Sequence, residues 1–336
     1  MEIGKFSTIG FVGNGMFGTV FKAKDNLLAV ERAVKIVQAK DPNEFMKAIN
    51  EAQILERCRH NHIVDIKEID IYPVEGVPAP CIVMEYLANG SVQNLLETKF
   101  VSCQKAVSTI SDCLFGLEHA HSQGILHRDI KPANILYSEN WQAKLSDFGL
   151  AYGLAHQVFD FEGYSSHLPH EVLEGSVQDE LSDLYSMGIT FFRMLNNLAI
   201  LDIPFANDAD WLRAVKKEKF PERIYPNHIP QQLIKISKKS IKSDRANRYQ
   251  TCLQFRQALQ AIHFCVEWHP LDADNWKGCH LSDVYEVSIH EKRSGFVIDF
   301  KRNGRKDNSR CYSQIPSEST AREFFYGLIR DTTLKI

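Results

Sequence analysis

Four side chains suited to phosphate chemistry lie close together near the middle of the chain. They are Asp129, Lys131, Asn134 and Asp147, within a stretch of about twenty residues. A carboxylate can accept the proton of a hydroxyl group, and an amide with a second carboxylate offers the oxygen ligands that Mg²⁺ prefers. Phosphoryl transfer needs this set, because its catalysis depends mostly on positioning and on electrostatic stabilisation around the metal.

A glycine pattern near the N-terminus could cradle phosphates. Gly13, Gly15 and Gly18 have the Gly-x-Gly-x-x-Gly spacing, with Val12 and Val20 beside them. Glycine lets the backbone approach a phosphate because it has no Cβ. A dinucleotide-binding turn shares this spacing, but there a helix follows the last glycine, whereas here β-type residues follow. We therefore predict a β-hairpin that covers the phosphates.

Taken together, the motifs resemble those of a known family. The run from His127 to Asn134 reads His-Arg-Asp-Ile-Lys-Pro-Ala-Asn, and Asp147-Phe148-Gly149 follows it. The pair is similar to the catalytic loop and the Asp-Phe-Gly motif of eukaryotic-type (Hanks-type) Ser/Thr protein kinases. The resemblance covers about 260 residues. It implies an α+β, bilobal protein-kinase fold with a β-rich N-lobe at residues 1–87 and a helical C-lobe at residues 88–265.

The resemblance implies a role for each residue of the central stretch. Asp129 would accept the proton of the substrate hydroxyl, and Lys131 would stabilise the transferring γ-phosphate. Asn134 and Asp147 would hold Mg²⁺. A lysine two residues after the catalytic aspartate is typical of the Ser/Thr branch. The cofactors implied are ATP and Mg²⁺, and the implied substrates are Ser and Thr hydroxyls on proteins, with autophosphorylation.

An ion pair in the N-lobe is also implied. Lys35 lies in a β-type run and would bind the α- and β-phosphates of the nucleotide. Glu51 lies in a stretch with helical spacing, residues 42–58, where the family places the glutamate that pairs with this lysine. The run from His60 to Asp65 resembles the junction after that helix and favours Glu51 over neighbouring glutamates.

An adenine pocket is implied by an apolar strand over Cys81–Tyr86, which resembles the hinge between the lobes. Met84 would be the gatekeeper, and the Glu85 carbonyl and the Leu87 backbone would face the adenine. The apolar side chains expected to enclose the ring are Val20, Ala33 and Leu136, which suits a mostly apolar pocket.

Residues 149–171 would form the activation segment, where the sequence departs most clearly from the family. Pro169-His170-Glu171 replaces Ala-Pro-Glu, although Glu171 could keep its ion-pair partner in Arg248. Tyr164 stands where most Ser/Thr kinases have a threonine, and Ser165 follows it. The geometry of peptide docking is therefore left open by the sequence.

Asp160 stands at the usual site of activating phosphorylation. Because Arg128 normally binds that phosphate, a fixed negative charge at Asp160 or Glu162 would make activity independent of phosphorylation. An acidic loop without this role is the alternative. Further along, Glu180–Gly188 resembles the start of a central helix, where a buried Asp183 would brace the backbone of the catalytic loop.

From Trp268 the apolar pattern changes to a period of two, outside the resemblance. Residues 284–290 and 296–300 predict a hairpin, Asn303-Gly304 predicts a second turn, and residues 309–315 predict a third strand. Residues 319–330 predict a helix capped by Ser317 or Ser319. The apolar side chains expected to be buried by this helix are Phe324, Phe325, Leu328 and Ile329. Residues 266–336 are thus expected to form a small β-β-β-α unit of unknown role.

This C-terminal unit holds a basic cluster that invites a nucleic-acid interpretation. The cluster comprises Lys301, Arg302, Arg305, Lys306 and Arg310. Acids are nearly as numerous across the unit, so a solvated loop or a face for docking a partner protein is favoured over nucleic acid.

The composition is that of an ordinary soluble protein. The chain has 336 residues, of which 44% are hydrophobic and 24% charged, and a net charge of -3. This balance argues against a nucleic-acid or membrane partner. The chain has neither a run of 18 apolar residues nor a signal-peptide pattern, and its eight cysteines have no metal-ligand spacing. We expect a cytoplasmic protein with reduced thiols.

Two other functions are weighed against the protein kinase. A small-molecule kinase is disfavoured by Asp183 and the Glu171–Arg248 pair, which build a peptide-docking lobe. A pseudokinase that acts as a scaffold is disfavoured because every expected catalytic side chain is present.

Overall fold

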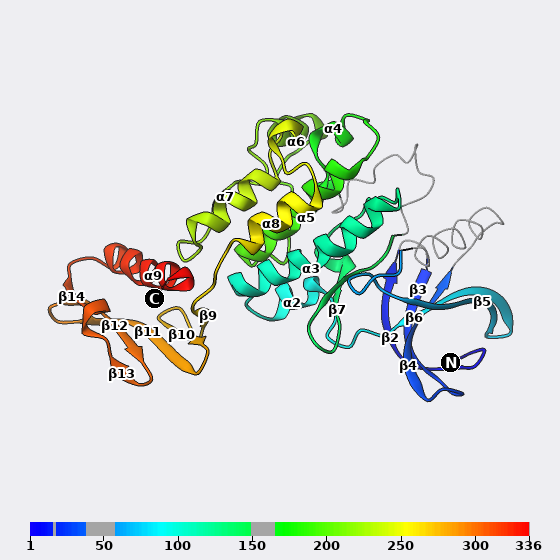
Figure 1. Cartoon of the computed structure of the whole chain (residues 1–336), viewed down its shortest axis with the longest axis horizontal. Helices are drawn as coiled ribbons and strands as arrows, with labels where there is room; N and C mark the ends of the chain where they lie inside the picture. The colour runs from blue at the N-terminus through cyan, green and yellow to red at the C-terminus, as the bar shows by residue number, and fades with distance from the viewer. Residues whose placement is uncertain (16–17, 38–57, 149–164, 336) are drawn as a thin grey trace. The chain divides into compact units, whose positions relative to one another are not determined.

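The computed structural model describes residues 1–15, 18–37, 58–148 and 165–335 (Figure 1). The chain folds into two compact units. Of the described residues, the first unit holds those within 1–94, 112–187 and 251–253. The second unit holds those within 95–111, 188–250 and 254–336.

The first unit begins with a closed antiparallel barrel of strand order β1-β2-β3-β4-β6-β5. Its strands are β1 (Glu2–Ile3), β2 (Phe6–Gly15), β3 (Gly18–Asp25), β4 (Val30–Val37), β5 (Ile66–Val74) and β6 (Val77–Glu85). Alternation along the strands sends one set of apolar side chains inward. These are Ile3, Phe6, Ala23, Val34, Cys81 and Val83. Because β4 pairs with both β3 and β6, Lys35 lies in the interior of the sheet.

Strands β2 and β3 form the hairpin that the glycine pattern predicts, with Gly15 paired to Gly18. Gly18 has a φ of 147°, and a Cβ there would lie 2.0 Å from the carbonyl oxygen of Ile36. Only glycine fits that position. A Cβ on Gly13 would meet no atom within 4 Å, so the fold itself does not require that glycine.

Mostly helical elements follow the barrel, as predicted for residues 88–265. The elements are α2 (Val92–Thr98), α3 (Cys103–Ser122), η1 (Pro132–Asn134), β7 (Ile135–Tyr137), β8 (Ala143–Leu145), η2 (Ser165–His167), α4 (His170–Leu173), α5 (Glu180–Asn196), α6 (Asp208–Lys216), α7 (Gln231–Ser240), η3 (Arg245–Asn247) and α8 (Cys252–Gln260). The β-rich start and the helical continuation confirm the predicted α+β class. No helix among the described residues has the length and apolar character needed to cross a bilayer.

The C-terminal region forms an antiparallel sheet with one helix along it, coloured orange to red in Figure 1. Its elements are β9 (Glu267–Pro270), β10 (Asn275–His280), β11 (Asp283–Lys292), β12 (Gly295–Arg302), β13 (Arg305–Lys306), η4 (Asn308–Arg310), β14 (Tyr312–Ile315) and α9 (Glu318–Leu334). The strand order is β13-β12-β11-β10-β9, and β14 also pairs with β12. The predicted hairpin and helix are confirmed, and the third strand is confirmed over Tyr312–Ile315, whereas residues 308–310 form η4. Strands β9, β10 and β13 were not predicted.

Local sequence explains the turns and the helix cap of this region. Asn303 and Gly304 have φ values of 51° and 75°, the left-handed pair that a two-residue hairpin turn of this kind requires. At the start of α9, the Ser317 hydroxyl accepts a hydrogen bond from the Thr320 amide at 3.2 Å. Ser317, rather than Ser319, is therefore the cap.

The core under α9 corrects one prediction. Ala321, Phe325 and Ile329 lie four residues apart, so they share one helix face, and all three are buried. Leu328 is only partly buried against this core. The predicted burial of Phe324 is wrong: its side chain is 42% exposed, because it lies beside that face and stacks on Tyr312 with ring centroids 5.0 Å apart.

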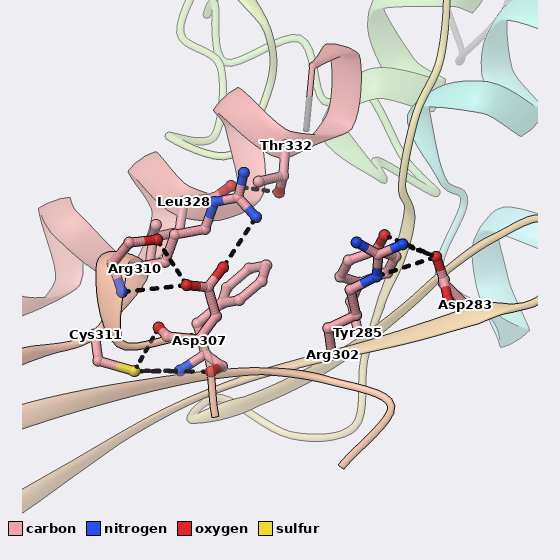
Figure 2. Close-up of polar contacts among 10 residues, drawn as sticks. Asp283, Tyr285, Arg302, Asp307, Arg310, Cys311, Leu328 and Thr332 are labelled. Carbon is pink, nitrogen blue, oxygen red and sulfur yellow. Dashed lines mark hydrogen bonds and ion pairs between the residues drawn. The ribbon is translucent and has the colours of Figure 1, made fainter. Parts of the chain in front are cut away.

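The basic cluster of the C-terminal region is largely neutralised within the sheet. Figure 2 shows the Arg302 guanidinium bound to Asp283, with Nε 3.1 Å from Oδ2. Figure 2 also shows Arg310 bound to Asp307, with Nη1 3.3 Å from Oδ2. Lys306 pairs with Asp299 at 2.6 Å. Three of the five cations are thus neutralised by carboxylates, which weakens the nucleic-acid interpretation.

The different burial of two adjacent phenylalanines predicts that their replacement destabilises the fold to different extents. Phe325→Ala should lower the free energy of unfolding by about 3–5 kcal/mol, because it leaves a cavity in the core. Phe324→Ala should cost only about 1 kcal/mol, since it removes an exposed ring stack. Urea unfolding of both variants measures the difference. Equal losses would contradict the assignment of the buried face.

His228 predicts a pH dependence of stability. Its ring lies 4.8 Å from that of Trp276 and 5.9 Å from that of Phe100, and burial lowers the pKa of His228 to about 4. As the pH falls below about 6.5, His228 becomes protonated in the unfolded chain but stays neutral in the folded chain. The free energy of unfolding therefore decreases by up to roughly 2 kcal/mol at pH 5. His228→Gln should remove this part of the slope in urea unfolding between pH 7 and pH 5.

The matched control is His290→Gln, whose histidine side chain is 40% exposed. This variant should keep the wild-type pH slope. The prediction fails if the two variants change the slope equally.

Candidate active site

A short hairpin brings two of the predicted site residues to the same end of the first unit. Strands β7 and β8 are antiparallel, with Ile135 opposite Leu145. Asn134 immediately precedes β7 and Asp147 closely follows β8, and the Ser146 amide donates to the Asn134 carbonyl at 2.9 Å. An amide and a carboxylate thus project from neighbouring positions of one hairpin.

The Asp129 carboxylate is held by two other residues of the predicted site. Its Oδ2 accepts hydrogen bonds from Lys131 Nζ at 2.7 Å and from Asn134 Nδ2 at 2.8 Å. Asn134 Nδ2 also donates to the Asp129 carbonyl at 2.9 Å. Among the described residues both side-chain bonds end on Oδ2, which leaves Oδ1 able to accept a bond from another donor.

Lys35 links the barrel to the β7–β8 hairpin. Its Nζ lies 3.1 Å from Asp147 Oδ1. The lysine side chain is only 4% exposed, whereas the Asp147 side chain is 49% exposed. The structure therefore places a buried ammonium behind a carboxylate that remains open to solvent.

The loop that begins with His127 and Arg128 is held in place by Asp183 of α5, which is 1% exposed. Its Oδ2 accepts from the His127 amide at 2.9 Å, and its Oδ1 accepts from the Arg128 amide at 2.8 Å. His121 Nε2 lies 2.9 Å from the same Oδ2. Hydrogen bonds from backbone N–H groups to a carboxylate are among the strong ones in proteins, so Asp183 rigidly positions the loop.

Two residues of the site have strained backbone conformations. Arg128 has a φ of 66° and Asp147 a φ of 54°, values that non-glycine residues rarely adopt. Such conformations persist where surrounding contacts hold them, often at functional sites. Next to these residues in sequence, the ring of buried His127 packs with its centroid 4.4 Å from that of Phe148, and burial lowers the pKa of His127. His127 is therefore a neutral packing residue.

The predicted pocket residues lie on the barrel and the hairpin. Val12 is exposed on β2, Val20 and Ala33 are half-buried on β3 and β4, and Ala33 pairs with Met84 across to β6. Leu87 is buried after β6, and Leu136 is half-buried on β7. Glu51 and Asp160 lie outside the described residues, as does Tyr164.

The side chain of Glu85 has a role that no local pattern predicts. Its Oε1 accepts from the Asp65 amide at 2.8 Å and from Lys144 Nζ at 2.7 Å. These bonds fasten the end of β6 to β8. Only the Glu85 backbone was singled out, because no local spacing signals partners 20 and 59 residues away.

Glu171 and Arg248 each have partners near them in sequence. Glu171 Oε2 lies 3.2 Å from His170 Nδ1. Arg248, which is 2% exposed, donates to the carbonyls of Lys242 at 2.6 Å and Ser243 at 2.9 Å. The ion pair between Glu171 and Arg248 stays a prediction.

The donor set suits a magnesium ion bound together with phosphates. No group of three His, Cys, Asp or Glu side chains is placed to hold a metal in the part of the chain that the structure describes. Mg²⁺ needs no such group, since it usually takes one or two protein oxygens and completes its shell with water and phosphate. The Asp147 carboxylate and the Asn134 amide oxygen would be those ligands.

Comparison with known proteins agrees with this geometry. A family model described as "Protein kinase domain" matches residues 6–264. Serine/threonine-protein kinase PknB of Mycolicibacterium smegmatis is 29% identical over 265 residues, which cover 75% of this chain and 42% of that protein. A probable serine/threonine-protein kinase of Streptomyces coelicolor is 28% identical over 295 residues, 84% of this chain and 43% of the relative. The chain therefore spans about two fifths of the length of these curated relatives.

The role of Asp183 is testable without an activity assay. Asp183→Ala should lower the free energy of unfolding by roughly 3–5 kcal/mol, because it leaves two amides near the catalytic loop without their acceptor. Hydrogen exchange at the His127 and Arg128 amides should accelerate in this variant. Asp208→Ala, which changes an exposed carboxylate on α6, should alter neither quantity by much. Unchanged protection of both amides in Asp183→Ala would refute the role.

Proposed function

The chain belongs to the protein kinase family, and from this premise we propose that it transfers the γ-phosphoryl group of ATP to Ser and Thr hydroxyls of proteins in an Mg²⁺-dependent reaction. The observation that supports the proposal best is the Asp129 carboxylate, held by Lys131 and Asn134 beside the hairpin that presents Asp147. The names of the relatives, which are serine/threonine kinases, agree with it.

In this proposal Asp129 orients the substrate hydroxyl through Oδ1 and accepts its proton. Lys131, whose Nζ bonds to Oδ2 of the same carboxylate, fixes the rotamer of the base and adds positive charge where the transferred group passes.

The nucleotide site of the proposal lies between the barrel and the β7–β8 hairpin, within the first unit. Bound Mg²⁺ would neutralise phosphate charge and align the γ-phosphoryl group. Asn134 and Asp147 hold the ion, and Lys35 binds phosphate oxygens, with Glu51 as its second partner. The β2–β3 hairpin covers the phosphates through the backbone of Gly13, Gly15 and Gly18.

We also propose which proteins accept the phosphoryl group and how the activity is regulated. Proteins bearing Ser or Thr are the acceptors, the chain itself among them, and the C-terminal sheet offers a face for a partner protein. Asp160 acts as a fixed negative charge for Arg128, so activity does not need phosphorylation of the activation segment. The proposed location is the cytoplasm.

Replacing the base tests the proposal. Asp129→Asn should reduce phosphoryl transfer by about 10²–10⁴-fold, because the amide cannot accept the proton. The assay follows label from γ-labelled ATP onto one acidic and one basic acceptor protein and onto the kinase itself. Analysis of the labelled amino acids should find phosphoserine and phosphothreonine.

The control is Asp331→Asn, which changes a carboxylate that is 72% exposed on α9 and should leave transfer unchanged. Thermal shift with Mg·ATP should show that Asp129→Asn still binds nucleotide. Label on tyrosine alone, label that survives Asp129→Asn, or nucleotide binding without label on any protein would each overturn the proposal.

A further inference from the structure

One region of the second unit is rich in positive charge, although the net charge of the whole chain is -3. Residues 213–245 contain ten of the 39 Lys and Arg residues but only three of the 42 Asp and Glu residues. Six lysines on α7 or beyond the ends of α6 and α7 are exposed or half-buried. We call them the α6–α7 basic surface: Lys217, Lys219, Lys235, Lys238, Lys239 and Lys242.

The carboxylate of Glu218 links the segments that follow α6 and α7. Glu218 follows α6 and accepts hydrogen bonds from Lys242 Nζ at 3.0 Å and from the Ser243 amide at 3.0 Å, both beyond α7. Arg223 Nη1 also binds Glu218, at 2.6 Å, and its Nη2 donates to the Ile241 carbonyl. The lysines that flank Glu218 in sequence are therefore brought to the end of α7 where Lys242 lies.

Most of these lysines are not neutralised. Among the described residues, no carboxylate lies within ion-pair distance of Lys217, Lys219 or Lys235, and Lys238 and Lys239 contact only the rings of Tyr225 and Tyr249. The C-terminal sheet behaves differently, since Arg302, Lys306 and Arg310 each have a carboxylate partner.

Helix stability accounts for only part of this pattern. Cations in the last turn interact favourably with the helix dipole, which explains Lys238 and Lys239. Lys235 lies earlier on α7, three and four residues before them, where like charges repel on a helix surface. Lys217 is the C-cap residue of α6, so its charge also favours that helix end, whereas Lys219 lies beyond the helix. The helix dipole therefore does not account for Lys219 or Lys235.

The chemistry of the surface favours an acidic protein segment over nucleic acid. Single-stranded nucleic acids bind to exposed aromatic rings and to arginine. Here the cations are lysines, Arg223 is engaged by Glu218, and lysines cover the faces of Tyr225 and Tyr249. Ile224, which is 64% exposed between these residues in sequence, offers an apolar contact suited to a peptide.

We propose that the α6–α7 basic surface, which includes none of the residues that carry out phosphoryl transfer, docks an acidic segment of the protein substrate. That the docked segment belongs to a substrate rests on the proposed function, but the docking itself requires no catalysis. Electrostatic complementarity of this kind contributes mostly to the rate of association and to selectivity among partners.

A binding assay with a defined probe tests the proposal. Fluorescein-labelled decaglutamate should bind the wild-type chain at low salt and dissociate as salt screens the charges. The triple variant Lys235→Gln/Lys238→Gln/Lys239→Gln should bind about tenfold more weakly, since it removes three exposed charge pairs. Lys217→Gln/Lys219→Gln should weaken binding independently. Asp129→Asn should bind as the wild type does, which separates docking from catalysis.

The matched control is Lys277→Gln/Lys292→Gln/Lys301→Gln, which removes the same charge from the C-terminal sheet and should leave the Kd unchanged. Circular dichroism establishes that each variant is folded, and the double variant tests the surface if the triple variant is not. The proposal is overturned if the wild type does not bind decaglutamate, or if the control weakens binding as much as the triple variant. Tighter binding of a uridine decamer or of phosphatidylserine vesicles at the same salt would also overturn it.

Discussion

The catalytic loop depends on one buried carboxylate. Asp183 accepts hydrogen bonds from two consecutive amides, those of His127 and Arg128, and is 1% exposed. A charge buried to this degree must be satisfied by hydrogen bonds, so the loop cannot leave α5 without exposing or stranding it. The same contacts hold Arg128 at a φ of 66°, a conformation that this residue would not keep by itself.

The fixed loop positions the polar groups beyond it. Asp129 directly follows the two anchored residues, and its carboxylate is locked by Lys131 and Asn134. Asn134 begins the β7–β8 hairpin, whose pairing brings Asp147 alongside and within 3.1 Å of Lys35 on β4. Each side chain is thus oriented by a neighbour before any substrate arrives, which is what a reaction governed by positioning requires.

The two basic regions of the second unit differ in how their charge is balanced. In the C-terminal sheet, acids on adjacent strands form ion pairs with Arg302 and Lys306 and neutralise them. On the α6–α7 basic surface, the Glu218 carboxylate is already shared by Arg223 and Lys242. A count of basic residues therefore says little about binding until their partners are known, because an exposed ion pair presents almost no net charge to a ligand.

Sequence alone determined the features that depend on neighbouring residues. The spacing of Asp129, Lys131, Asn134 and Asp147 indicated the chemistry, and period-two alternation with Asn303-Gly304 indicated the hairpins, because φ preferences and strand periodicity are local properties. Only the tertiary structure decided the rest. Partners distant in sequence placed the Glu85 side chain on Lys144, and packing against Tyr312 left Phe324 exposed. Strands β9 and β10 were missed because they include Pro270 and Gly278, so pairing across the sheet, rather than their own propensity, makes them strands.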